Sequence, residues 1–134
     1  MVFPFEVCGR PMNAGRAKLK KTDLAIITLT VITATIHFYR ASVNPKVTVL
    51  FTLNGLGFII LVAMLYLPYL SSQVHPRLIL RILMGYTALT FLLYFAWSIV
   101  SSDWVLPYGP IVKLIEALLF ILLWRDERAL NAGI

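Results

Sequence analysis

Few ionisable side chains lie within the long apolar runs of this chain, and three of them could do chemistry: His37, Lys113 and Glu116. A titratable group in such surroundings is costly to bury, so each one is a candidate functional residue. Lys113 and Glu116 are three residues apart, a spacing that lets two side chains of a helix pair as ions. A buried histidine can form hydrogen bonds, or it can ligate a metal or a pigment through one ring nitrogen.

Catalysis is not expected from these residues. Asp23 and Asp103 fall at opposite ends of the predicted helices, so no Ser-His-Asp or Cys-His set can be assembled around His37. The sequence has neither a glycine-rich phosphate loop nor a paired metal motif. Its single cysteine, Cys8, cannot form an intramolecular disulfide. We therefore predict that the protein is not an enzyme.

The second histidine limits which cofactor His37 could hold. A b-type haem normally takes one axial histidine from each of two helices, but His75 lies in a loop at the opposite end of the predicted bundle. Haem b is therefore not expected. A single axial ligand for a chlorophyll-type pigment, or a hydrogen bond to a quinone, remains the cofactor alternative for His37. His37 and Glu116 together give too few ligands for a structural zinc site.

The elements that must position these residues are transmembrane helices. The chain is 60% hydrophobic and 13% charged, whereas soluble domains are about 45–50% apolar and about 25% charged. Four apolar runs predict spans at 22–40, 47–67, 78–100 and 110–126, with Thr22 or Asp23 as the first helix cap. The fourth apolar run, 111–124, is short, but Pro110 at its start and Trp124-Arg125 at its end favour a full span. The predicted fold is all-α, an antiparallel four-transmembrane-helix bundle.

Positive charge predicts the orientation of this bundle. Nine Lys and Arg residues fall on the side of the termini and three on the other, which predicts that both termini are cytoplasmic. Five of the nine lie in the tail 1–21, which we expect to contact anionic lipid headgroups. The formal charge of +6 does not indicate nucleic-acid binding, because no aromatic-interleaved basic face is present. We expect a multi-pass protein of the prokaryotic cytoplasmic (inner) membrane.

Helical spacing and depth predict a polar cluster near the outer end of the bundle. Thr30, Thr33 and His37 form one stripe of the first helix, and a second stripe on the third helix comprises Thr87, Thr90, Tyr94 and Trp97. At about 1.5 Å per residue, polar side chains from four helices lie roughly 5–10 Å below the same end. The predicted cluster comprises His37, Asn54, Tyr94, Lys113 and Glu116. We expect interhelical hydrogen bonding there, with an ion or ligand site as the alternative. Gly55 and Gly57 would let another backbone approach Asn54.

Several segments of the sequence are similar to those of a known group of proteins. They are residues 37–39, 51–58, 63–68, 83–90 and 113–119, which include His37, Asn54 and Glu116. Together they resemble a family of small four-helix prokaryotic integral membrane proteins of uncharacterised function. The resemblance implies the four-helix architecture and implies no activity.

The expected function follows from size and architecture. A chain of 134 residues with short loops has no room for a separate soluble domain. Its lipid-facing surfaces could dock other integral membrane subunits, as in small accessory subunits of respiratory or photosynthetic complexes. The alternatives are a small transporter or ion pathway that uses the polar cluster, and a pigment- or quinone-binding subunit with an outer-leaflet site at His37.

Overall fold

The computed structural model describes residues 19–71, 74–104 and 106–133, so most of the predicted basic tail 1–21 lies outside the described residues. The described chain is all-helical. Its four long helices are α1 (Lys21–Val43), α2 (Thr48–Tyr66), α4 (Pro76–Ser101) and α5 (Tyr108–Asn131), and α3 (Pro68–Ser71) is a single turn.

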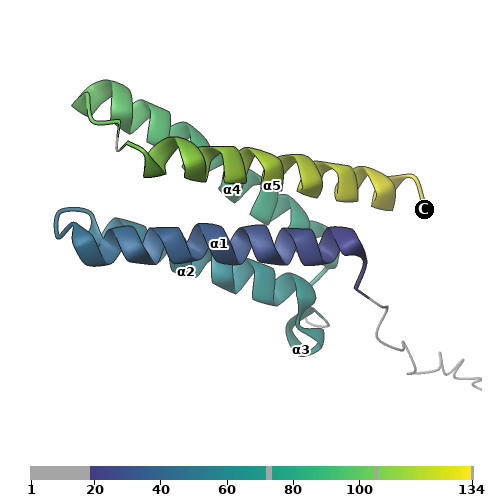
Figure 1. Cartoon of the computed structure of the whole chain (residues 1–134). Coiled ribbons are helices and arrows are strands. Elements are labelled where there is room, and N and C mark those ends of the chain that lie inside the picture. Colours follow the sequence, from purple (N-terminus) through teal and green to yellow (C-terminus); the bar gives the residue numbers. More distant parts are fainter. Residues whose placement is uncertain (1–18, 72–73, 105, 134) are drawn as a thin grey trace, which may run out of the picture.

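The four long helices form a bundle in which neighbours run in opposite directions (Figure 1). Helix α1 packs against α2 and α5, and α4 packs against the same two helices, so the order around the bundle is α1, α2, α4, α5. The start of α1 and the end of α5 lie at one end, called here the terminal end. The loops 44–47 and 102–107 lie at the other, called here the loop end.

Three of these helices, α1, α2 and α4, are long and apolar enough to cross a membrane. This supports the prediction of a membrane protein, and these three helices cover three of the four segments predicted to span. Helix α5 is not among the three, although its 24 residues exceed the length needed to span. Lys113, Glu116 and the charged last turns from Arg125 onward explain the difference, because every stretch of α5 long enough to span contains at least three charged side chains.

The helix ends differ slightly from the predicted ones. Helix α1 starts at Lys21, before both predicted caps, and the Asp23 carboxylate accepts a hydrogen bond from the Lys20 N–H at 2.7 Å. The predicted turn at Asn44 is present, because its carbonyl accepts from the Val47 N–H at 3.2 Å. Helix α4 stops where Ser102 adopts the left-handed conformation, with φ of 54°.

The apolar core fills the bundle from its middle towards the terminal end. Its fully buried members are Ile26, Ala34, Phe58, Leu80, Leu83, Leu119 and Leu123. The α1 and α2 backbones come close beside it at Gly55, where an added Cβ would lie 3.2 Å from the Ala34 carbonyl oxygen. The backbone that approaches α2 at Gly55, as predicted, is therefore that of α1. At Gly57 the neighbour is a side chain, the Tyr86 phenol.

Candidate functional site

His37 is buried in the bundle, on the predicted stripe of α1. Thr30 and Thr33 are fully buried and His37 is 3% exposed, so this stripe does face inward. The Nδ1 atom of His37 lies 2.7 Å from the carbonyl oxygen of Thr33. A carbonyl oxygen can only accept, so Nδ1 carries the hydrogen, and in a neutral ring Nε2 is then an acceptor.

Lys113 and Glu116 of α5 form a buried ion pair. Lys113 Nζ lies 2.6 Å from Glu116 Oε2, and the two residues are 7% and 0% exposed. Thr90 of α4 contacts both partners. Its carbonyl accepts from Lys113 Nζ at 3.2 Å, and its hydroxyl hydrogen is shared between the Thr87 carbonyl at 3.0 Å and Glu116 Oε2 at 3.4 Å. A second helix, α4, therefore covers the pair, unlike the exposed i, i+3 pairs on the surface of a helix.

The second carboxylate oxygen of Glu116 turns towards α1. His37 Nε2 lies 3.9 Å from Glu116 Oε1, which is longer than a hydrogen bond. Within the described chain, Oε1 has no hydrogen-bond partner although it is buried. The rings of Phe51 and Phe58 of α2 lie beside the imidazole, at centroid distances of 5.5 Å and 5.9 Å. All four long helices therefore meet at this point.

Tyr94 of α4 lies on the side of this centre nearer the loop end. Its ring centroid is 5.2 Å from Lys113 Nζ, and its hydroxyl donates to the Trp104 carbonyl at 2.9 Å. The predicted stripe ends there, because Trp97 is 55% exposed and lies on the outside of the bundle. The inclusion of Trp97 in the inward stripe was wrong, because at about 100° of rotation per residue Trp97 points roughly 80° away from Thr87, ten residues earlier on the same helix.

Asn54 is placed differently from the other predicted cluster residues. It is half-buried, and its backbone carbonyl accepts a hydrogen bond from the Tyr86 hydroxyl at 3.2 Å. In the described structure its side chain makes no hydrogen bond to His37 or Glu116. The face that α2 turns to α1 centres on Gly55 and Phe58, and Asn54 lies at the edge of this face, beside α4.

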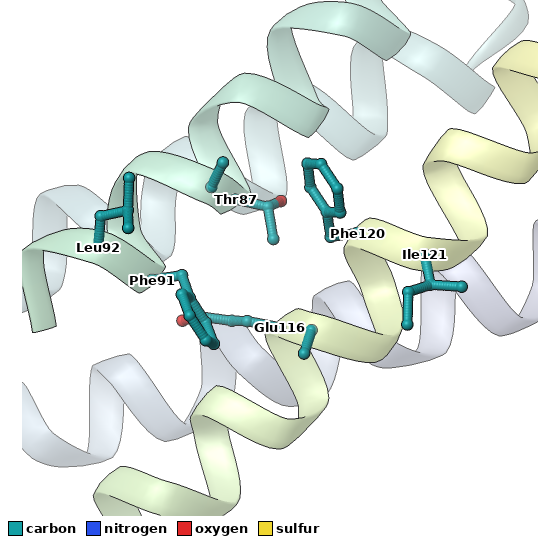
Figure 2. A pocket seen from close by; sticks show the side chains of 8 residues that line it. Thr87, Phe91, Leu92, Glu116, Phe120 and Ile121 are labelled. Carbon is teal, nitrogen blue, oxygen red and sulfur yellow. The ribbon is translucent and has the colours of Figure 1, made fainter. Parts of the chain in front are cut away.

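A groove of about 340 Å³ lies between α4 and α5, next to the buried pair. Figure 2 shows Phe91 and Phe120 at this groove, with Thr87 and Glu116 between them. The other lining residues are apolar: Ala88, Leu92, Ala117 and Ile121. The Thr87 hydroxyl donates to the Leu83 carbonyl, and the fully buried Glu116 carboxylate faces Lys113 and His37, so the groove itself is apolar.

The cofactors considered from the sequence do not fit this geometry. The described residues contain no group of three or more His, Cys, Asp or Glu that could hold a metal ion. A tetrapyrrole needs an open face above its axial ligand, but His37 Nε2 lies next to Glu116 and its ring lies beside Phe51 and Phe58. A quinone would meet apolar walls in the groove, because the Thr87 hydroxyl is bonded within α4 and the unpartnered Oε1 of Glu116 faces His37 inside the bundle.

Sequence reasoning missed two features of the site. It placed Thr90 on an inward stripe but did not assign it to the Lys113–Glu116 pair. It also overlooked Phe51 and Phe58, whose seven-residue spacing puts them on one face of α2 and could have identified them.

Comparison with known proteins assigns no family to the chain. No protein-family model, curated protein or solved structure gives a significant match. The resemblance to small four-helix membrane proteins stays a prediction.

Proposed function

We propose that this protein is a non-catalytic integral membrane subunit that packs against other membrane-spanning subunits in a larger complex of respiratory or photosynthetic type. The observation that supports the proposal is the distribution of side chains. Large apolar residues cover the outer surface of the long helices, for example Leu53, Leu92 and Leu114, which are 62%, 64% and 68% exposed. The ionisable groups within the bundle contact one another. The outside is therefore suited to lipid and to apolar helices, and the loops are too short for a separate catalytic domain.

We further propose that the terminal end faces the cytoplasm of a prokaryotic cell. Basic residues gather at this end of the described chain, and cytoplasmic flanks of membrane helices are enriched in Lys and Arg. They are Lys20, Lys21, Arg77, Arg81, Arg125 and Arg128. The same charges suit anionic lipid headgroups.

Purification in a mild detergent tests the subunit role. A tagged chain should migrate with a much larger assembly, and mass spectrometry should find other integral membrane proteins in constant ratio to it. Leu53→Ala, Leu92→Ala and Leu114→Ala each trim one outer face, and at least one should release the partner while the bundle stays folded. Leu119→Ala, which trims the core, serves as the control for loss of folding. Migration as a lone chain or a homo-oligomer in every mild detergent would overturn the proposal.

A small ion pathway is the second candidate, and the buried centre of His37, Lys113 and Glu116 favours it. Ionisable groups inside membrane helices often mark ion routes. A route through one copy would have to cross the apolar core beyond Glu116, so conduction would need a second copy to complete the pathway. Protein-dependent cation or proton flux into liposomes, lost in Glu116→Gln, would establish this function.

A further inference from the structure

Two hydrogen-bond acceptors face each other without a donor at the centre of the bundle. Because Nδ1 of His37 donates to the Thr33 carbonyl, Nε2 of the neutral ring has only a lone pair to offer. Its neighbour at 3.9 Å, Glu116 Oε1, is a carboxylate oxygen that receives no hydrogen bond from the described residues. A buried acceptor without a donor is costly. One added proton would satisfy both atoms.

We propose that His37 Nε2 and Glu116 Oε1 form a proton-binding site that exchanges with solution at the loop end of the bundle. A hydronium ion at that end releases its proton and becomes water, and a new O–H or N–H bond forms on one of the two atoms. The pair then closes from 3.9 Å to hydrogen-bond length, about 2.6–3.0 Å. No other bond is made or broken. The charge of the centre changes from zero, with Lys113 positive and Glu116 negative, to plus one.

The groups around the pair come from every packed helix. Helix α1 contributes Thr33, and α2 contributes the rings of Phe51 and Phe58, which carry no charge. Helix α4 contributes the Thr90 hydroxyl, which donates to Glu116 Oε2. Lys113 of α5 is the one charged neighbour of Glu116 in the described structure, and it is bound to the other carboxylate oxygen. Oε1 therefore remains available for the added proton.

Access is one-sided because contacting polar groups lead from the pair to the loop end, whereas the buried hydroxyls on the other side, Thr30, Thr33 and Thr87, are followed by the apolar core. Lys113 is one turn nearer that end than Glu116, and Tyr94 beneath its amine reaches the Trp104 carbonyl in the loop. Towards the terminal end, Thr87 donates to its own helix at 2.8 Å, and beyond it lies the buried core with Leu80, Leu83 and Leu123. A proton should therefore enter and leave by the same end.

Nuclear magnetic resonance of the full chain in lipid nanodiscs, with isotope-labelled histidine, tests the site directly. His37 and His75 are the two histidines of the sequence, so two sets of ring signals are expected. The exposed His75 gives the second set of signals in the same sample. Acidification should convert the His37 Nε2 signal from a bare to a hydrogen-bonded nitrogen. In Glu116→Gln the side-chain amide can donate to Nε2 at every pH, so the midpoint should move by at least about one pH unit, a tenfold change in proton affinity.

Glu127→Gln is the matched control, because Glu127 pairs with Arg81 outside this centre, and it should leave the His37 signal unchanged. If Glu116→Gln does not fold, infrared spectra of the wild-type chain with labelled glutamate decide instead. Acidification should either produce a carboxylic acid band from an apolar environment, if Oε1 takes the proton, or shift the carboxylate band, if Oε1 accepts a hydrogen bond from protonated Nε2. An unchanged His37 titration in Glu116→Gln, or no change in either band, would overturn the site. Protein-dependent proton flux across liposomes would overturn its one-sided access. This inference goes beyond the subunit role and does not depend on whether a partner is found.

Discussion

Removal of the Glu116 carboxylate should be among the most damaging single changes to this bundle. In Glu116→Leu the amine of Lys113, which is 7% exposed, loses its ion partner at 2.6 Å and keeps only the Thr90 carbonyl. Breaking one partner of a buried pair costs about 3–5 kcal/mol, because the remaining charge is left uncompensated. Glu116→Gln keeps an acceptor for Lys113 and has nearly the same volume, so we expect a clearly smaller loss.

The double variant separates the pair from its surroundings. Replacing Lys113 by Met as well as Glu116 by Leu removes both charges, and such replacements are often neutral or stabilising by about 1–4 kcal/mol. The second substitution should therefore restore stability, with a coupling energy of several kcal/mol between the two positions. The Arg81–Glu127 pair is the matched control: its atoms are also 2.6 Å apart, but the Arg81 side chain is 59% exposed, so its coupling should be about 0–1 kcal/mol.

The assay is equilibrium unfolding in mixed micelles. The helix content of the original chain, Glu116→Leu, Lys113→Met and the double variant is followed as denaturing detergent is added. If Glu116→Leu is as stable as the original chain, or if the double variant loses more than the sum of the two single changes, the ion pair does not stabilise the bundle. A rise in stability in Glu116→Leu would mean that the carboxylate is kept for function at a cost to the fold.

Further predictions concern two glycines of the bundle, two of its hydroxyl side chains and the topology of its last helix. Gly85→Ala should stabilise α4 by about 0.5–1 kcal/mol, because the added methyl group meets nothing within 4 Å. Gly55→Ala should destabilise the chain in the same unfolding assay, because its methyl group meets the α1 backbone. Ser98→Ala should leave stability unchanged or raise it, because this buried hydroxyl has no partner in the described structure, and Thr90→Val should cost about 0.6 kcal/mol through loss of its bond to Glu116. Reporter fusions at the C-terminus and within loop 102–107 should lie on opposite sides of the membrane, and finding them on the same side would exclude a spanning α5.

Hydrophobic runs and helical spacing predicted most of the fold. Each of the four long helices covers its predicted span to within a few residues at the start, because proline, asparagine and the polar loops interrupt the apolar sequence at defined places. Helix α5 continues to Asn131, past the predicted span 110–126, because residues 127–131 stay helical although Glu127, Arg128 and Asn131 are polar. Hydropathy identifies the part of a helix that lipid covers, and it does not reveal charged helical turns beyond that part.

The candidate site was predicted less completely, since spacing gives the face of a side chain and not its partner. The stripe of His37 and the pairing of Lys113 with Glu116 depend on contacts within one helix, which periodicity determines. The position of Asn54 depends instead on how α2 is rotated between α1 and α4. The close approach at Gly55 and the contact of Gly57 with Tyr86 fix that rotation, and neither could be read from one helix alone.

The position of Lys113 and Glu116 on one helix also bears on how the protein is made. If α5 enters the bilayer, it must carry two ionisable groups into it, but their i, i+3 spacing lets them neutralise each other as soon as the first turns of the helix have formed. Helix α4 is synthesised earlier and is joined to α5 by the short loop 102–107. The Thr90 carbonyl that accepts from Lys113 is therefore already in place when the lysine arrives. Because α4 is synthesised before α5, the Thr90 carbonyl is made before the Lys113 amine that donates to it, so α5 can be inserted after α4 as the charged helix of a hairpin.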